Sequence, residues 1–287
     1  MTYSRLIAGT MTWGSWGKQL SKKEMVALMN FCISNQITTF DHADIYGAYT
    51  TEADFGKAFT SSGIKRGDIQ LISKCGIQYI SENRKNKVKH YDYSKDYIIW
   101  SVEESLKHLE TDYLDLLLLH RPSPLMVAEE IAEAITILKK DGKIRDFGVS
   151  NFTPSQMEMV GLRMDIDVNQ IEFSLTQHSA MHDGTLDYMM TCGIKPMAWS
   201  PLGNVFREDN EQTRRIHKQL GVLMDKYNAT EDQLLLAWTL KHPSGIHPVV
   251  GTTTKERLKQ AVEASQINLE LEDWFLILVA SQGYKVP

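Results

Sequence analysis

The chain has 287 residues, of which 43% are hydrophobic and 23% charged, a composition typical of a globular protein. The net charge of −5 makes nucleic acid an unexpected partner, and the short basic stretch "ENRKNKVKH" is interpreted as a solvated loop. No stretch has the ~20 apolar residues that cross a bilayer, and the first residues lack the apolar region of a signal peptide. The scattered Cys32, Cys75 and Cys192 lack metal-type spacing, so we expect no metal site and a reduced, cytoplasmic protein.

Apolar periodicity predicts strands and helices that alternate along the chain. Short apolar runs predict strands at 6–11, 37–41, 69–74, 113–120, 144–150, 168–174, 194–200 and 246–251. Amphipathic segments between them predict helices beginning at Ser21, Thr51, Ser94, Met126, Thr153 and Leu186, then two at about 211–226 and 231–241, and one at 254–265.

Helix starts are marked by capping boxes, in which a Ser or Thr side chain and a Glu or Gln three residues later each bond the other's backbone. Ser21 with Glu24 and Thr153 with Gln156 fit this pattern. A third box, Thr253 with Glu256, is expected near the end of the chain.

Eight strand–helix units in one chain favour a closed (β/α)₈ TIM barrel, with residues 1–287 forming a single domain. The Gly-rich fingerprint that marks dinucleotide-binding open sheets is missing. In a barrel of this kind, chemistry occurs at the carboxyl ends of the strands. The ionisable side chains at or just after these ends are Asp41, Tyr46, Lys74 and His120, so we expect them to converge on one mouth.

Seven motifs resemble those of the aldo-keto reductases, in order and at similar spacing: "FDHADIYG", "ISKCG", "YLDLLLLHRP", "KIRDFGVSNF", "VNQIEFS", "AWSPLG" and "GTTTKERL". The likeness runs from "GTMTWG" at Gly9 to Arg257 and beyond. It implies a barrel oxidoreductase that reduces aldehydes or ketones with NADPH, with a catalytic tetrad of Asp41, Tyr46, Lys74 and His120.

The chemistry explains why these residue types are needed. Carbonyl reduction places a hydride on carbon and a proton on oxygen, and Tyr46, with an ordinary pKa of about 10, would donate that proton as general acid. Lys74 would stabilise the tyrosinate and lower its pKa, and Asp41 would compensate the charge of Lys74. His120 would orient the substrate carbonyl. Taken singly, Asp41, Tyr46 and His120 are more often turn, packing or core residues, and only their combination indicates catalysis.

The resemblance also implies a cofactor site. Ser150, Asn151 and Gln170 match positions that hold the nicotinamide carboxamide, although turn and cap roles would suit them as well. Trp199 would stack on the nicotinamide ring or pack in the barrel. The residues that would bind the pyrophosphate and the 2′-phosphate are Ser200, Leu202, Gly203, Thr252, Thr253 and Arg257.

The chain departs from the family pattern at several of these positions. Gly251 stands where many members have lysine, and Gln260 and Ala261 where many have Glu-Asn, which weakens the expectation of NADPH over NADH without reversing it. His42 stands where threonine is common and is interpreted as structural.

In the family that this chain resembles, variable loops build the substrate pocket. Trp13, with Tyr46 and His120, is a candidate substrate-binding residue, although it could equally be packing. Variable loops at 76–92 and 203–212 would shape the pocket, and the short tail "ASQGYKVP" predicts an open mouth. The partner is expected to be a small carbonyl compound, and the chain a monomer or weak oligomer.

Two other functions stay open at this point. A cofactor-binding regulatory or sensor subunit of the same family would keep the same tetrad. A phosphate-binding barrel lyase or isomerase would use Lys74 to form a Schiff base, although that function leaves "GVSNF" and Arg257 unexplained.

Overall fold

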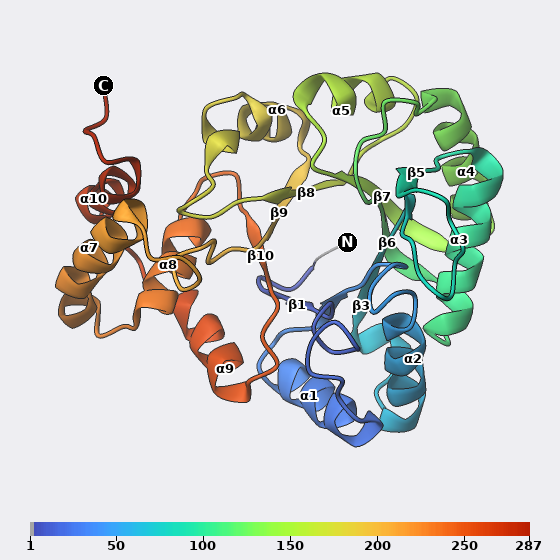
Figure 1. The fold of residues 1–287 in the computed structure, drawn as a ribbon, viewed down its shortest axis with the longest axis horizontal. Coiled ribbons are helices and arrows are strands. Elements are labelled where there is room, and N and C mark those ends of the chain that lie inside the picture. The colour runs from blue at the N-terminus through green and yellow to red at the C-terminus, as the bar shows by residue number, and fades with distance from the viewer. Residues whose placement is uncertain (1–2) are drawn as a thin grey trace.

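The computed structural model describes residues 3–287. Eight parallel strands close into a barrel, and helices surround it (Figure 1). Around the barrel the strands follow the order β1 (Ile7–Gly9), β10 (His247–Val250), β9 (Lys195–Trp199), β8 (Val168–Glu172), β7 (Ile144–Ser150), β6 (Leu114–Leu119), β3 (Gln70–Cys75) and β2 (Thr39–Asp41). Seven strands lie within predicted segments and β3 extends one residue beyond its segment, so the prediction of a single-domain (β/α)₈ barrel is confirmed.

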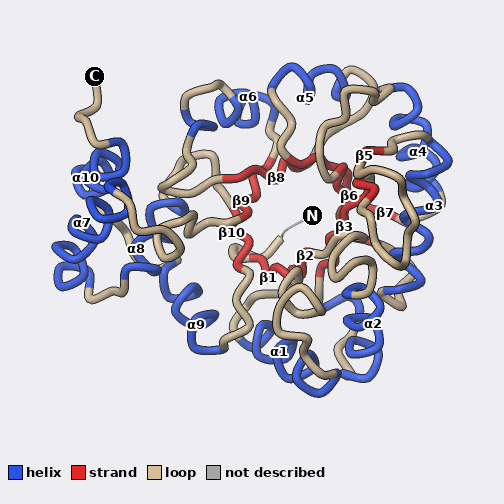
Figure 2. Tube along the Cα trace, in the orientation of Figure 1, coloured by secondary structure: helices blue, strands red, loops and turns tan. Residues whose placement is uncertain are grey.

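The helices form an outer ring, with the strands inside it (Figure 2). They are α1 (Lys22–Ser34), α2 (Thr51–Ser62), α3 (Lys95–His108), α4 (Ala128–Lys140), α5 (Pro154–Gly161), α6 (Thr185–Cys192), α7 (Glu211–Tyr227), α8 (Glu231–Leu240), α9 (Lys255–Ala264) and α10 (Leu271–Gln282). Two single 3₁₀ turns, Arg66–Asp68 and Ser179–Met181, lie in connecting segments.

The core has two layers, as expected for strands buried on both faces. Every residue of β6 is buried, which accounts for its unbroken apolar sequence. Inside the barrel, apolar side chains from several strands fill the interior: Ile7, Ile72, Leu116, Leu118, Val168, Met197 and Val249. The barrel is therefore packed, and only its ends can hold a ligand.

The predicted capping boxes are correct at two helices and wrong at a third. Ser21 with Glu24 caps α1, and Thr153 with Gln156 caps α5. The box predicted for Thr253 and Glu256 does not form, because α9 begins one residue later, with Thr254 at the cap and no side-chain capping bond. The backbone N–H groups of the first turn of α9 therefore receive no side-chain cap.

Two features go beyond simple alternation. The polar loop after β3 contains a short antiparallel sheet, β4 (Ile77–Gln78) with β5 (His90–Tyr91), and the basic stretch between them is mostly exposed, as predicted. The last helix, α10, packs beside α7 at the periphery, and the C-terminus lies beyond it, away from the barrel axis (Figure 1). None of the helices in residues 3–287 is long and apolar enough to span a bilayer.

Candidate active site

Four ionisable side chains meet at the carboxyl end of the barrel. Asp41 ends β2, Lys74 lies near the end of β3, and His120 directly follows β6. Tyr46 lies in the turn that leads from β2 to α2. The strand-end positions in the sequence predict this convergence, and the structure shows it.

Lys74 lies at the centre of the group. Its Nζ lies 2.8 Å from Asp41 Oδ1, 2.7 Å from Asp41 Oδ2 and 2.8 Å from the carbonyl oxygen of His42. It also donates to the phenol oxygen of Tyr46 at 3.2 Å. The Lys74 side chain is only 1% exposed, so these acceptors replace the water that an ammonium would otherwise bind.

Burial and charge act in opposite directions on these pKa values. Burial alone would lower the pKa of Lys74, but the Asp41 carboxylate and Tyr46 raise it above its ordinary value. Burial raises the pKa of Tyr46, and the charge of Lys74 opposes this without cancelling it. The predicted lowering of the Tyr46 pKa is therefore wrong in its net direction, because burial outweighs the lysine. Both groups are protonated at neutral pH.

His120 lies beside the phenol, with its ring centroid 6.1 Å from that of Tyr46. Burial, followed by the charges of Lys74 and Arg121, holds the pKa of His120 well below its usual value. The imidazole is thus neutral at pH 7, with one ring nitrogen able to donate and the other to accept. Its Nδ1 is buried and has no hydrogen-bond partner among residues 3–287.

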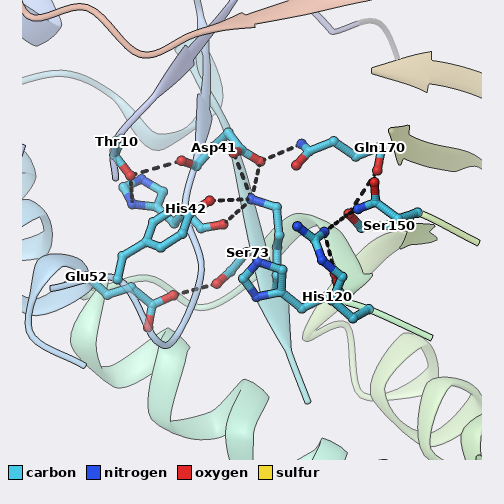
Figure 3. Close-up of polar contacts among 12 residues, drawn as sticks. Thr10, Asp41, His42, Glu52, Ser73, His120, Ser150 and Gln170 are labelled. Atoms are coloured by element: carbon cyan, nitrogen blue, oxygen red, sulfur yellow. Dashed lines mark hydrogen bonds and ion pairs between the residues drawn. The ribbon is translucent and has the colours of Figure 1, made fainter. Parts of the chain in front are cut away.

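Asp41 is held in place from several sides (Figure 3). Gln170 Nε2 donates to Asp41 Oδ1 at 2.9 Å, and the hydroxyl of Thr10 donates to the backbone oxygen of Asp41 at 2.9 Å. Thr10 also bonds His42 Nδ1 at 2.9 Å. His42 is fully buried against Phe55, and burial lowers its pKa to about 3. These contacts support the interpretation of His42 as structural.

Ser150, Asn151 and Trp199 form a connected polar group on the opposite side of the mouth. Ser150 Oγ donates to the carbonyl of Gln170 at 2.8 Å and accepts from Asn151 Nδ2 at 2.9 Å and from Arg121 Nη1 at 3.2 Å. Asn151 Oδ1 accepts from Trp199 Nε1 at 3.1 Å. The hydroxyl of Ser150 is fully satisfied here, so this structure gives it no free donor for a carboxamide.

The remaining residues predicted for the cofactor follow β9 and β10, which are neighbours in the barrel. Gly203 adopts a φ of +54°, and a Cβ there would lie 2.0 Å from Thr176 Oγ1, so only glycine fits this turn. Arg257 is exposed on the first turn of α9 and forms no side-chain hydrogen bond or ion pair within residues 3–287. The other predicted residues of these two loops are partly exposed: Ser200, Leu202, Thr252 and Thr253.

The structure corrects the substrate-binding prediction for Trp13. This residue is 1% exposed and packs against Phe40 and Phe55, so it belongs to the core. Trp16 lies at the mouth instead, 38% exposed, with its ring 6.3 Å from Tyr46. Only two residues separate the two tryptophans, and no pattern in the sequence distinguishes the buried one from the exposed one.

Arg121 was not predicted as a site residue, although its backbone follows His120 directly in "LLLLHRP". Its guanidinium lies 5.2 Å from the centre of the Trp199 ring. The signal was available, because a residue that directly follows a strand-ending histidine also lies at the carboxyl end of the barrel.

Two buried carboxyl groups behind Lys74 were missed as well. Glu52 on α2 is 3% exposed and accepts a hydrogen bond from Ser73 at 2.5 Å, and Asp44 is 5% exposed. Burial raises the pKa of each carboxyl to about 7. No group of three or more His, Cys, Asp or Glu side chains in residues 3–287 is arranged to hold a metal ion.

Comparison with known proteins yields a family for nearly the whole chain. Residues 5–278 match the aldo/keto reductase family. An uncharacterized oxidoreductase of Bacillus subtilis, YcsN, is 43% identical over 293 residues, covering 100% of this chain and 97% of the relative.

A relative and a solved structure with descriptive names also match. A 6-dehydroglucose reductase of Agrobacterium fabrum is 36% identical over 99% of this chain and 96% of its own length. The crystal structure of an aldo/keto reductase from Klebsiella pneumoniae in complex with NADP and acetate is 26% identical, with a TM-score of 0.79 over 98% of this chain and 92% of that one.

Proposed function

Because this chain belongs to the aldo/keto reductase family and is an oxidoreductase of that family, we propose that it reduces a small aldehyde or ketone to the alcohol with NADPH. The observation that carries the proposal is the buried contact of Lys74 with both Tyr46 and Asp41. A phenol at the mouth of a barrel, held against a charge-compensated ammonium, suits proton donation to a carbonyl oxygen.

Each member of the group has a distinct part in this proposal. Tyr46 donates its proton to the carbonyl oxygen, and Lys74 stabilises the tyrosinate that forms. Asp41 favours the charged form of Lys74 and offsets the cost of burying the ammonium. His120, neutral and beside the phenol, hydrogen-bonds the carbonyl and directs it towards Tyr46.

The residues present fit the cofactor. The first turn of α9 has no side-chain cap, and the guanidinium of Arg257 extends from that turn without a partner among the described residues. Such a helix end, with its free N–H groups and a nearby arginine, suits a phosphate. Arg257 would contact the 2′-phosphate and favour NADPH over NADH, and Trp199 would stack on the nicotinamide. When bound, NADPH supplies the hydride.

The structure does not favour a Schiff-base role for Lys74. A Schiff base requires a neutral amine, whereas Asp41 and Tyr46 raise the pKa of Lys74. The ammonium also has its acceptors within the protein, so no neutral, accessible amine is offered to a carbonyl.

The test is oxidation of NADPH by the purified protein with a panel of aldehydes and ketones, including 6-dehydroglucose, the substrate in the name of one relative. We expect turnover with at least one compound. NADPH binding without turnover on any compound would point instead to the sensor role. A covalent lysine adduct trapped by borohydride would favour the Schiff-base chemistry.

A further inference from the structure

Arg121 brings a second cation to the mouth, beside the residues that would hold the carbonyl. Its Nη1 donates to the backbone oxygen of His120 at 3.1 Å and to Ser150 Oγ at 3.2 Å. Its guanidinium carbon lies 5.2 Å from the centre of the Trp199 ring. The guanidinium therefore lies between the proposed carbonyl-binding histidine and the proposed nicotinamide-stacking tryptophan.

The backbone of Arg121 is fixed by a buried tyrosine. Tyr93 OH donates to the carbonyl of Arg121 at 2.5 Å and accepts from its N–H at 3.1 Å. Gly76 makes room for this ring, because a Cβ at Gly76 would lie 1.9 Å from Tyr93 Cε1. The backbone of Arg121 is thus held in one position at the carboxyl end of β6.

The charge of Arg121 has no close counter-charge. Both of its side-chain hydrogen bonds come from Nη1 and go to neutral oxygens, and it forms no ion pair within residues 3–287. Glu172 attracts it only from beyond ion-pair distance. At the other end of the barrel, Arg66 has a carboxylate partner, with Nη2 2.6 Å from Asp115 Oδ2.

A partly buried guanidinium without a counter-charge is costly, and an anion that binds it recovers both attraction and hydrogen bonds. Nε and Nη2 carry three of the five guanidinium N–H groups and can present two parallel bonds to a carboxylate. The groups that Arg121 contacts, His120 and Ser150, are neutral and do not repel an incoming anion, and Glu172 acts only from beyond ion-pair distance.

We propose that Arg121 binds a carboxylate carried by the substrate, so that the protein prefers aldehydes and ketones that are also carboxylic acids. This inference rests on the proposed carbonyl reduction. His120 and Tyr46 take the carbonyl end of the substrate, and Arg121 takes the acid end.

The experiment compares 4-oxobutanoate with its methyl ester, which differ in charge while keeping the same aldehyde chain. The quantity measured is the ratio of kcat/KM for the acid to that for the ester. Arg121→Gln removes the charge and keeps a polar side chain with an N–H donor, although a shorter one. We expect the ratio to fall roughly 10- to 150-fold, the range for loss of a charged hydrogen bond, mainly through KM of the acid.

Two further variants control for charge and geometry. Arg121→Lys keeps the charge without the two-pronged geometry, so part of the preference should return. Arg163→Gln removes an arginine that pairs with Glu129 on the outside of the molecule, and the ratio should stay at the wild-type value. Thermal unfolding of each variant shows whether it is folded.

The proposal and the proposed function can fail separately. Wild-type turnover of the ester shows carbonyl reduction whether or not the acid is preferred. A ratio that is unchanged in folded Arg121→Gln would overturn the carboxylate site. So would an unchanged ratio with weaker NADPH binding, since Arg121 would then serve the cofactor.

Discussion

Lys74 Nζ lies 3.2 Å from the phenol oxygen of Tyr46, and the register of the barrel explains why. In the pairing of β2 with β3, Asp41 lies opposite Ile72, and Lys74 follows two residues later on the same face. Side chains two apart on a strand point the same way, so Lys74 points inward like Ile72, which is part of the apolar interior. The lysine is thus placed between the aspartate and the turn that carries the tyrosine.

Replacing Tyr46 with Phe should abolish most carbonyl reduction while leaving the fold and NADPH binding intact. Loss of a general acid typically lowers the rate by ~10²–10⁴-fold. The measurement is kcat on the best carbonyl substrate, with NADPH binding by fluorescence as the control. Wild-type turnover by Tyr46→Phe would show that another group supplies the proton.

Lys74→Met should reduce kcat strongly and also destabilise the barrel. It leaves the buried carboxylate of Asp41 without its counter-ion, and breaking a buried pair in this way costs about 3–5 kcal/mol. Asp41→Asn should slow turnover less, because the ammonium keeps its bonds to Tyr46 and to the backbone of His42. Thermal unfolding and kcat are measured on both variants. Full activity of a folded Lys74→Met protein at every pH would contradict the role given to the lysine.

Arg257→Ala should weaken binding of NADPH and leave binding of NADH almost unchanged. A charge-assisted hydrogen bond contributes about 1.5–3 kcal/mol, so the dissociation constant for NADPH should rise roughly 10- to 150-fold. Titration by tryptophan fluorescence measures both cofactors, since Trp199 would report stacking.

The matched control for Arg257 is Lys259→Ala, which removes another exposed cation from α9, one that lies 3.8 Å from Glu263. It should affect neither cofactor. Equal losses for both cofactors in Arg257→Ala would exclude a specific phosphate contact. Tighter wild-type binding of NADH than of NADPH would reverse the assignment of the cofactor.

Glu52→Gln should flatten the dependence of stability on pH. Burial raises the pKa of Glu52 to about 7, above its value in the unfolded chain, so the folded state binds an extra proton between the two values. The free energy of unfolding is therefore highest below the unfolded pKa and falls as pH rises towards 7, by about 1.4 kcal/mol per pH unit for one proton.

Denaturant unfolding of wild type and Glu52→Gln at pH 5 to 8 measures this difference. Glutamine keeps the oxygen that accepts from Ser73, so the hydrogen bond is retained. Glu263→Gln, which neutralises a surface acid, should leave the wild-type slope unchanged. Equal slopes of the free energy of unfolding against pH for wild type and Glu52→Gln would show that the pKa of Glu52 is not raised by folding.

Local sequence patterns were sufficient to predict the barrel architecture and the ionisable residues at its carboxyl end. Strict alternation of strand and helix signals located all eight barrel strands, and strand-end positions located Asp41, Lys74 and His120. This works because the parallel strands of one barrel all end at the same mouth, so the residues that end different strands lie near one another. Two of the three capping boxes were also correct, since a capping box is a contact within four residues.

Other features were decided by contacts between distant segments, which no local pattern encodes. Trp13 and Trp16 are three positions apart in the sequence. Packing against Phe40 and Phe55 buries Trp13, whereas Trp16 lies at the mouth beside Tyr46.

The sequence by itself therefore determined the barrel, its family and four ionisable residues at its mouth, because these follow from short-range pattern and order. Only the tertiary structure decided the pKa values and the charge partners of these residues. The pKa of Tyr46 depends on how deeply the phenol is buried as well as on its distance from Lys74, and burial prevails. Arg121 likewise lacks a counter-charge because no carboxylate of residues 3–287 forms an ion pair with its guanidinium. Burial and distance between remote segments exist only once the chain has closed into a barrel.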